Sequence, residues 1–145
     1  MDLNFGKKYK DFTKEVKDFC KKYKGIHFID SSKVPLSGSF KSGEIKMTRS
    51  DWQKILIEKG YFARSIPSEY GGYGGESDII KSRIIAEEFA KSKIPPPMGG
   101  QGIDMLVPTL LELGTEEQKQ KYIKPTLHGE IIWCQGYSEP NAGSD

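Results

Sequence analysis

The residues best suited to chemistry lie at the C-terminal end of the chain, in the segment GYSEPNAGSD from Gly136 to Asp145. Ser138 and Ser144 supply hydroxyl groups, and fixed donors of this kind can stabilise negative charge on a bound anion or cofactor. Gly143 has no side chain, so the backbone there can approach a ligand closely. Composition alone predicts a turn here, and the donors are what add a possible binding role.

Other candidate sites are weaker. His27 and His128 lie far apart in the sequence, and neither has a partner at a metal-ligand spacing. The glycines of GGYGG at 71–75 lack the order and the lysine of a phosphate loop, so they predict turns. Glu87 and Glu88 are adjacent on a predicted helix and point about 100° apart, so they cannot share one proton. We therefore predict no metal site and no catalytic residue in this chain.

The elements that must position the C-terminal segment follow from the spacing of apolar residues. Helices are predicted over 4–24, from a cap at Thr48 or Ser50 to Gly60, from a cap at Ser77 to the prolines at 95–97, over 101–113 and over 116–123. Pro108 either kinks its helix or marks a first turn, and Pro125 opens one more turn. Residues 25–47 are predicted as a long loop and 131–137 as strand-like. The expected fold is all-α, an up-and-down bundle of about five helices with a strand-like C-terminal tail.

Two of these helices have clear apolar faces. In the first helix the apolar residues that should pack on the other helices are Phe5, Phe12, Val16 and Phe19. Its lysines alternate with acids, as in Lys7 with Asp11, which favours a solvated face over a phosphate-binding one. The third helix presents Ile79, Ile80, Ile84, Ile85 and Phe89.

Composition fits one ordinary globular domain. The chain has 145 residues and a formal charge of +2, which predicts neither disorder nor a nucleic-acid partner. No apolar run is long enough to span a membrane, and the first residues lack the apolar core of a signal peptide, so a cytoplasmic location is expected. Cys20 and Cys134 show no CxxC spacing and are expected to be reduced thiols.

The C-terminal segment resembles the signature of the acyl-CoA dehydrogenases, which reads as a small residue, an apolar one, Ser or Thr, Glu, two free positions, a small residue and Gly-Ser-Asp. Further segments occur in the order of that family: PSEYGG at 67–72, AEEFA at 86–90, PTLLELGTEEQKQKYI at 108–123 and HGEIIWCQGYSEP at 128–140. The resemblance covers roughly 48–145 and looks most like the bacterial branch with pimeloyl-CoA and steroid-side-chain dehydrogenases. Tyr137 stands where the family more often has an aliphatic residue.

The resemblance implies that residues 1–130 form the N-terminal helical domain and that 131–145 begin a central β-domain. In this family FAD lies between the β-domain and C-terminal helices. The residues that match flavin contacts are Gln135, Tyr137 and Ser138 at the ring and Gly143 and Ser144 at the pyrophosphate, with Ser144 alternatively at the CoA. The helix over 101–113 resembles the one that lines the acyl cavity, so Gln101 and Met105 are expected to line it or simply to be packed.

The resemblance also implies the reaction, the α,β-dehydrogenation of an acyl-CoA in lipid metabolism or fatty-acid β-oxidation, with electrons passed to an electron-transfer flavoprotein. A homo-oligomer is expected for the complete enzyme. The family places its catalytic glutamate beyond Asp145, so the chain alone is expected to be inactive and not to keep FAD. Two alternatives stay open: a flavin monooxygenase or nitroalkane oxidase of the same fold, and a stand-alone helical module whose first helix binds a partner.

Overall fold

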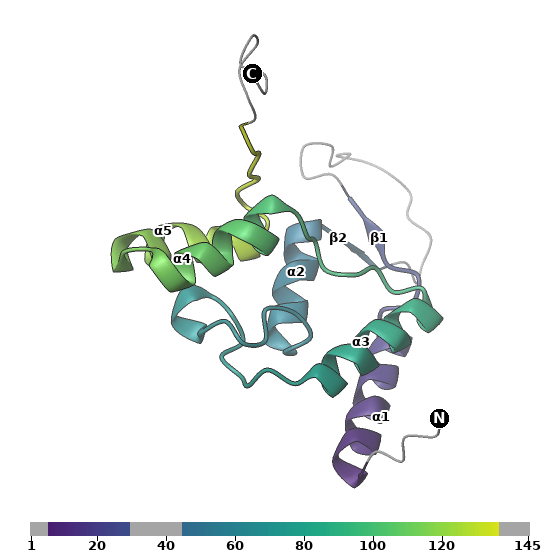
Figure 1. Ribbon diagram of the computed structural model, residues 1–145. Coiled ribbons are helices and arrows are strands. Elements are labelled where there is room, and N and C mark those ends of the chain that lie inside the picture. Colours follow the sequence, from purple (N-terminus) through teal and green to yellow (C-terminus); the bar gives the residue numbers. More distant parts are fainter. Residues whose placement is uncertain (1–5, 30–44, 137–145) are drawn as a thin grey trace, which may run out of the picture.

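The computed structural model describes residues 6–29 and 45–136, and this part of the chain is mostly helical (Figure 1). In chain order the elements are α1 (Lys7–Lys22), β1 (His27–Phe28), β2 (Lys46–Met47), α2 (Arg49–Glu58), a 3-10 turn (Ser68–Tyr70), α3 (Ile79–Ser92), a π-helical turn (Gly102–Leu106), α4 (Val107–Leu113) and α5 (Glu116–Leu127). Five α-helices are therefore present among the described residues, which confirms the predicted all-α class.

Helix α2 lies between two hydrophobic clusters. Leu56 faces the first cluster, which α1 and α3 complete, and Ile57 faces the second, which α4 and α5 complete. Figure 1 shows the same arrangement, with α1 beside α3 on one side of α2 and α4 beside α5 on the other. Because neighbouring residues of one helix face the two clusters, α2 holds both halves of the domain together.

The first cluster is rich in aromatic rings. Phe19 of α1 is at its centre, with ring centroids 4.9 Å from Tyr61, 5.7 Å from Trp52 and 5.9 Å from Phe89. Phe12 and Val16 of α1 are buried beside it, as their spacing predicted, while Phe5 lies outside the described residues. The apolar face of α1 is thus covered within this chain, which removes the main feature that favoured a partner-binding module.

Helix α2 begins and ends where the sequence predicted. The Thr48 side chain accepts from the backbone N–H of Asp51, and the Asp51 side chain accepts from that of Thr48, which makes a capping box. After the helix, Gly60 has a φ of +67°, a conformation in which glycine is least strained.

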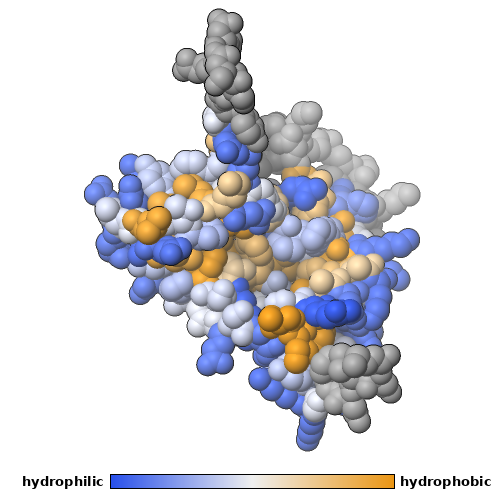
Figure 2. Space-filling model, viewed as in Figure 1, coloured by the Kyte–Doolittle hydropathy of each residue, from blue (hydrophilic) through white to orange (hydrophobic). Residues whose placement is uncertain are grey.

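Helix α3 is capped by Asp78, so the prediction of Ser77 was wrong by one residue. Asp78 Oδ1 accepts from the backbone N–H of Lys81 over 3.0 Å, and a carboxylate at this helix end also interacts favourably with the helix dipole. Ile84 and Ile85 are buried as predicted, but Ile79 is 84% exposed. Figure 2 shows an exposed hydrophobic patch over this end of α3.

The predicted loop over 25–47 contains two short strands. His27 pairs with Lys46 and Phe28 with Met47 in a parallel two-stranded sheet. The backbone N–H of His27 donates to the Ile45 carbonyl over 2.9 Å. Strands of two residues are too short to give an alternating pattern, which is why the sequence did not reveal them.

Near the C-terminus, Pro108 has one of its two predicted places, in a first helical turn, whereas the helix that contains Pro125 is longer than predicted. The segment predicted as one helix over 101–113 starts with the π-helical turn, in which the N–H of Val107 donates to the Gly102 carbonyl. Pro108, which has no N–H to donate, lies in the first turn of α4. Helix α5 runs through Pro125 to Leu127 rather than ending near residue 123. The described part of the tail, 131–136, forms no strand, and among the described residues no helix is long and apolar enough to cross a membrane.

Candidate functional site

The loop between α3 and the π-helical turn is fixed by two side chains of α2. Gln53 is fully buried; its Nε2 donates to the Met98 carbonyl over 3.3 Å, and its Oε1 accepts from the Met98 N–H over 2.9 Å. Trp52 Nε1 donates to the Pro95 carbonyl over 3.1 Å. Because both backbone groups of Met98 are paired, the loop that leads to Gln101 has a defined path.

Gln53 was not predicted as a structural residue, although the sequence held a signal for it. Leu56 and Ile57 follow it by three and four positions, so Gln53 shares a helix face with two buried apolar residues. A polar residue on such a face is expected to need buried hydrogen-bond partners. Those partners are backbone groups 45 residues away in the sequence, and no local pattern identifies them.

The π-helical turn places Gln101 and Met105 on the side of the helix that faces the C-terminal tail. The turn is anchored at its start, where the Gly100 N–H donates to Asp104 Oδ2 over 2.9 Å. At its end Thr109 Oγ1 donates to the Met105 carbonyl over 2.8 Å. Met105 is 55% exposed, so its side chain is not part of the packed core.

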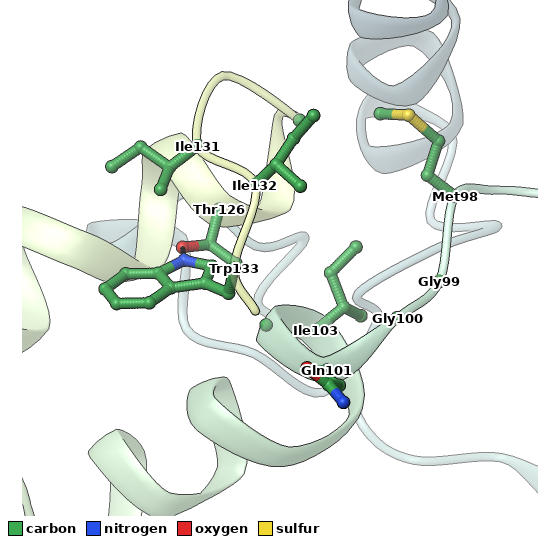
Figure 3. Close-up of a pocket in the computed structure, with 11 residues that line it drawn as sticks. Met98, Gly99, Gly100, Gln101, Ile103, Thr126, Ile131, Ile132 and Trp133 are labelled. Carbon is green, nitrogen blue, oxygen red and sulfur yellow. Dashed lines mark hydrogen bonds between the residues drawn. The ribbon is translucent and has the colours of Figure 1, made fainter. Parts of the chain in front are cut away.

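Trp133 attaches the tail to the helices. Its Nε1 donates to Thr126 Oγ1 over 2.8 Å, and the Thr126 hydroxyl in turn donates to the Tyr122 carbonyl over 2.6 Å (Figure 3). The rings of Trp133 and Tyr122 meet edge to face with centroids 5.6 Å apart. Buried Gly102 leaves room for the indole, because a Cβ there would overlap Trp133 Cδ1. Trp133 was not among the predicted site residues, although it lies just before them in the sequence.

Two cavities share Trp133 in their linings. The first has a volume of about 140 Å³ and is lined by residues of the 98–103 loop and turn, by Thr126 of α5, by Gly129 after that helix, and by the tail. The second has a volume of about 240 Å³ and is lined by Gln101, Met105, Leu106, Thr109, Trp133, Cys134 and Gln135.

The second cavity brings together the predicted site residues that the structure describes. Gln101 Nε2 donates to Gln135 Oε1 over 3.4 Å, so a predicted substrate residue contacts a predicted cofactor residue. Met105 lines the same cavity. The remaining predicted site residues, Tyr137, Ser138, Gly143 and Ser144, lie outside the described residues.

A small charged cluster lies where the tail leaves α5. Glu130 Oε1 is 3.0 Å from Lys54 Nζ and 3.6 Å from His128 Nδ1. Lys54 holds the pKa of Glu130 below its usual range. Burial lowers the pKa of His128, and the Glu130 carboxylate opposes that shift. The neutral imidazole is therefore favoured, and the ion pair of Lys54 with Glu130 ties α2 to the start of the tail.

Glu87 and Glu88 do not form an acid–base pair. Arg83 Nε lies 2.8 Å from Glu87 Oε1 and holds the pKa of that carboxyl below its usual range. Lys91 Nζ lies 3.1 Å from Glu88 Oε1. Lys91 Nζ also lies 3.8 Å from Glu87 Oε2, so both carboxylates are paired with cations of α3. Residues 6–29 and 45–136 contain no cluster of three or more His, Cys, Asp or Glu side chains that could hold a metal ion, and both cysteines are free.

The comparisons with known proteins agree on one family. The sequence model for the acyl-CoA dehydrogenase N-terminal domain matches residues 7–130. The chain is 36% identical over 110 residues to acyl-CoA dehydrogenase IpdE1 of Mycolicibacterium smegmatis, a match that covers 76% of this chain and 28% of the relative. It is 29% identical over 147 residues to glutaryl-CoA dehydrogenase of Desulfococcus multivorans, with 100% of this chain and 35% of the relative covered.

A solved structure has the same fold. The chain superimposes on a subunit of the ChsE4–ChsE5 complex from Mycobacterium tuberculosis with a TM-score of 0.57 and 23% identity, over 99% of this chain and 33% of that one. The chain therefore spans about a third or less of the length of these relatives.

Proposed function

The chain belongs to the acyl-CoA dehydrogenase family, and from that premise we propose that it is the N-terminal helical domain of an FAD-dependent enzyme that dehydrogenates an acyl-CoA between its α and β carbons. Residues 1–130 would be this domain and residues 131–145 the start of a central β-domain. The similarity to a mycobacterial acyl-CoA dehydrogenase supports the bacterial branch that the sequence resembles.

One observation carries the proposal: Gln135 meets Gln101 and Met105 at one cavity. These residues come from the two segments that the family resemblance assigns to cofactor and substrate. The side-chain amides of Gln101 and Gln135 can hydrogen-bond the polar edge of a flavin. The apolar surfaces of Met105 and Trp133 beside them can contact an acyl chain. FAD, when bound, would accept the hydride that leaves the β-carbon.

The roles of this chain's residues are to bind and to orient. Gln135, Tyr137 and Ser138 would hold the flavin ring, and hydroxyl or amide donors there would stabilise negative charge as it develops. Gly143 and Ser144 would lie along the pyrophosphate, where a residue without a side chain allows close approach; Ser144 could instead bind the CoA. Gln101 and Met105 would line the acyl cavity.

The base that takes the α-proton would come from another part of the complete protein. The second cavity has no carboxylate among the described residues that line it. The chain alone is therefore expected neither to keep FAD nor to act on an acyl-CoA, because an enclosed site needs walls from further domains. An electron-transfer flavoprotein as acceptor and a homo-oligomeric state are further parts of this proposal.

The test is to purify the complete protein that carries this chain, record its absorption spectrum and assay dye reduction with acyl-CoAs of different length. A bound flavin that acyl-CoA reduces is the expected result. Oxygen-dependent turnover of a nitroalkane, with no reduction by any acyl-CoA, would favour the oxidase alternative instead. Stoichiometric flavin or turnover in the 145-residue chain alone would contradict the need for further domains.

A further inference from the structure

Trp133 and Gln101 each line both cavities of the candidate site. The two cavities therefore adjoin at these two residues, which we call the partition. Gln101 belongs to the end of the 98–101 loop and Trp133 to the tail, so the partition is built where two distant segments meet. On the side of the second cavity, Gln101 Nε2 donates a hydrogen bond to Gln135 Oε1 over 3.4 Å.

The first cavity is suited to aliphatic groups. Ile103, Ile131, Ile132 and Met98 line it together with glycines (Figure 3). Gln101 and Thr126 are the polar side chains in this lining, and no charged side chain lines it among the described residues. An acyl chain that passed the partition would find an apolar space there.

The partition has a fixed position because Trp133 is held on three sides. Thr126 accepts from the indole nitrogen over 2.8 Å, Tyr122 contacts the ring edge to face, and Gly102 lets the indole approach the π-helical turn. The paired indole N–H and these ring contacts restrict the half-buried side chain to this orientation. Its bulk, rather than its hydrogen bond, is what separates the cavities.

We propose that Trp133 determines substrate specificity by ending the acyl cavity, so that acyl chains too long or too branched for the second cavity are rejected. This inference rests on the proposed function, since it takes the cavity at Gln101 and Met105 as the acyl site. It predicts that a smaller residue at 133 joins the first cavity to the second and extends the space open to the acyl chain.

The experiment compares kcat/KM of the complete flavin-loaded protein for straight-chain acyl-CoAs of increasing length and for branched ones. In Trp133→Leu the ratio of kcat/KM for the longest over the shortest substrate should rise by about tenfold or more, because each accommodated methylene is worth roughly that factor. The control is Tyr73→Leu, which removes an exposed aromatic ring that belongs to neither cavity lining. It should keep the wild-type ratio.

The outcomes separate this inference from the proposed function. If the wild-type protein binds flavin but oxidises no acyl-CoA, both the proposed function and the role of Trp133 are contradicted. If the wild type is active and Trp133→Leu keeps its length profile, only the role of Trp133 is overturned. A shift of equal size in Tyr73→Leu would also overturn it, because a change away from both cavities would then have the same effect.

A second measurement needs no variant, in case Trp133→Leu does not fold. An acyl-CoA with a photoreactive diazirine at the far end of its chain is bound to the wild-type holoenzyme and irradiated. Labelling of Trp133, found by peptide mapping, supports the inference. Labelling confined to other residues overturns it.

Discussion

The phenol of Tyr70 donates a hydrogen bond to Glu116 Oε2 over 2.8 Å, which joins the turn after α2 to the first turn of α5. This bond to Glu116 raises the pKa of Tyr70 from 10.0 to about 12. A raised pKa in the folded state means that the contact stabilises the fold below pH 10.0 and that this stabilisation is lost as the pH rises through about 12.

Tyr70→Phe is expected to lower Tm by a few degrees at neutral pH, because the buried ring stays and only the bond to Glu116 is lost. In an alkaline absorbance titration the variant should also lack one of the late-ionising tyrosines. Tyr73→Phe is the matched control, since Tyr73 is exposed and its ring contact with Arg64 does not need the hydroxyl. An equal Tm in the two variants would contradict the role given to Glu116.

Phe19→Ala is expected to reduce the free energy of unfolding by about 3 to 5 kcal/mol, the usual cost of deleting a buried ring. The reason is its central place among Trp52, Tyr61 and Phe89. Denaturant unfolding followed by circular dichroism measures the change. Ile79→Ala removes an aliphatic side chain that is 84% exposed and should cost less than about 0.5 kcal/mol.

Gly102→Ala is expected to destabilise the domain and to move Trp133. Alanine favours a helix by about 1 kcal/mol over glycine, but overpacking costs typically 1 to 3 kcal/mol, and the new Cβ would overlap the indole. Near-ultraviolet circular dichroism and tryptophan fluorescence should both change. Gly99→Ala is the comparison, because a Cβ there meets Asp104 Oδ2 only at 3.4 Å; similar spectra for both variants would refute close packing at 102.

The charged cluster at the start of the tail predicts a pH response. Because burial lowers the pKa of His128 below 6.5, the neutral imidazole stabilises the fold above pH 6.5, and this contribution is lost as the pH falls through the lowered pKa. Glu130→Gln should lower the pKa of His128 further, and Lys54→Met should raise it. Imidazole NMR titrations measure both shifts in the pKa of His128, and Lys21→Met on α1 is the control that should leave this pKa unchanged. If Glu130→Gln and Lys54→Met shifted the pKa in the same direction, this arrangement of charges would be ruled out.

Ser138→Ala in the complete protein is expected to slow flavin reduction by acyl-CoA, since a donor aimed at developing charge is worth on the order of 1 to 4 kcal/mol. Stopped-flow absorbance measures the rate. Ser82→Ala on α3, whose hydroxyl donates to the Asp78 carbonyl, serves as a control away from the site. Full flavin occupancy with an unchanged rate would exclude Ser138 from the flavin.

The sequence predicted the elements that are marked by regularly spaced apolar residues or by capping residues. It missed the contacts that depend on distant parts of the chain. The buried face of α1 and the limits of α2 follow from local spacing and capping residues, so both were predicted. The pairing of His27 with Lys46 and the bonds of Gln53 to Met98 depend on residues far along the chain, and no period reveals them. Trp133 was missed because the tail has no periodic pattern that would pair it with Thr126 of α5 or with Gly102 of the π-helical turn.

The packing of α1 on α3 has a consequence for synthesis of the chain. Roughly 60 residues separate the two helices, which at about 5 to 20 residues per second takes on the order of 3 to 12 s to translate. During that time α1 has left the ribosome without the helix that covers Phe12, Val16 and Phe19. The nascent chain therefore exposes an amphipathic helix until α3 emerges, and this is the stage at which a chaperone would protect it from aggregation.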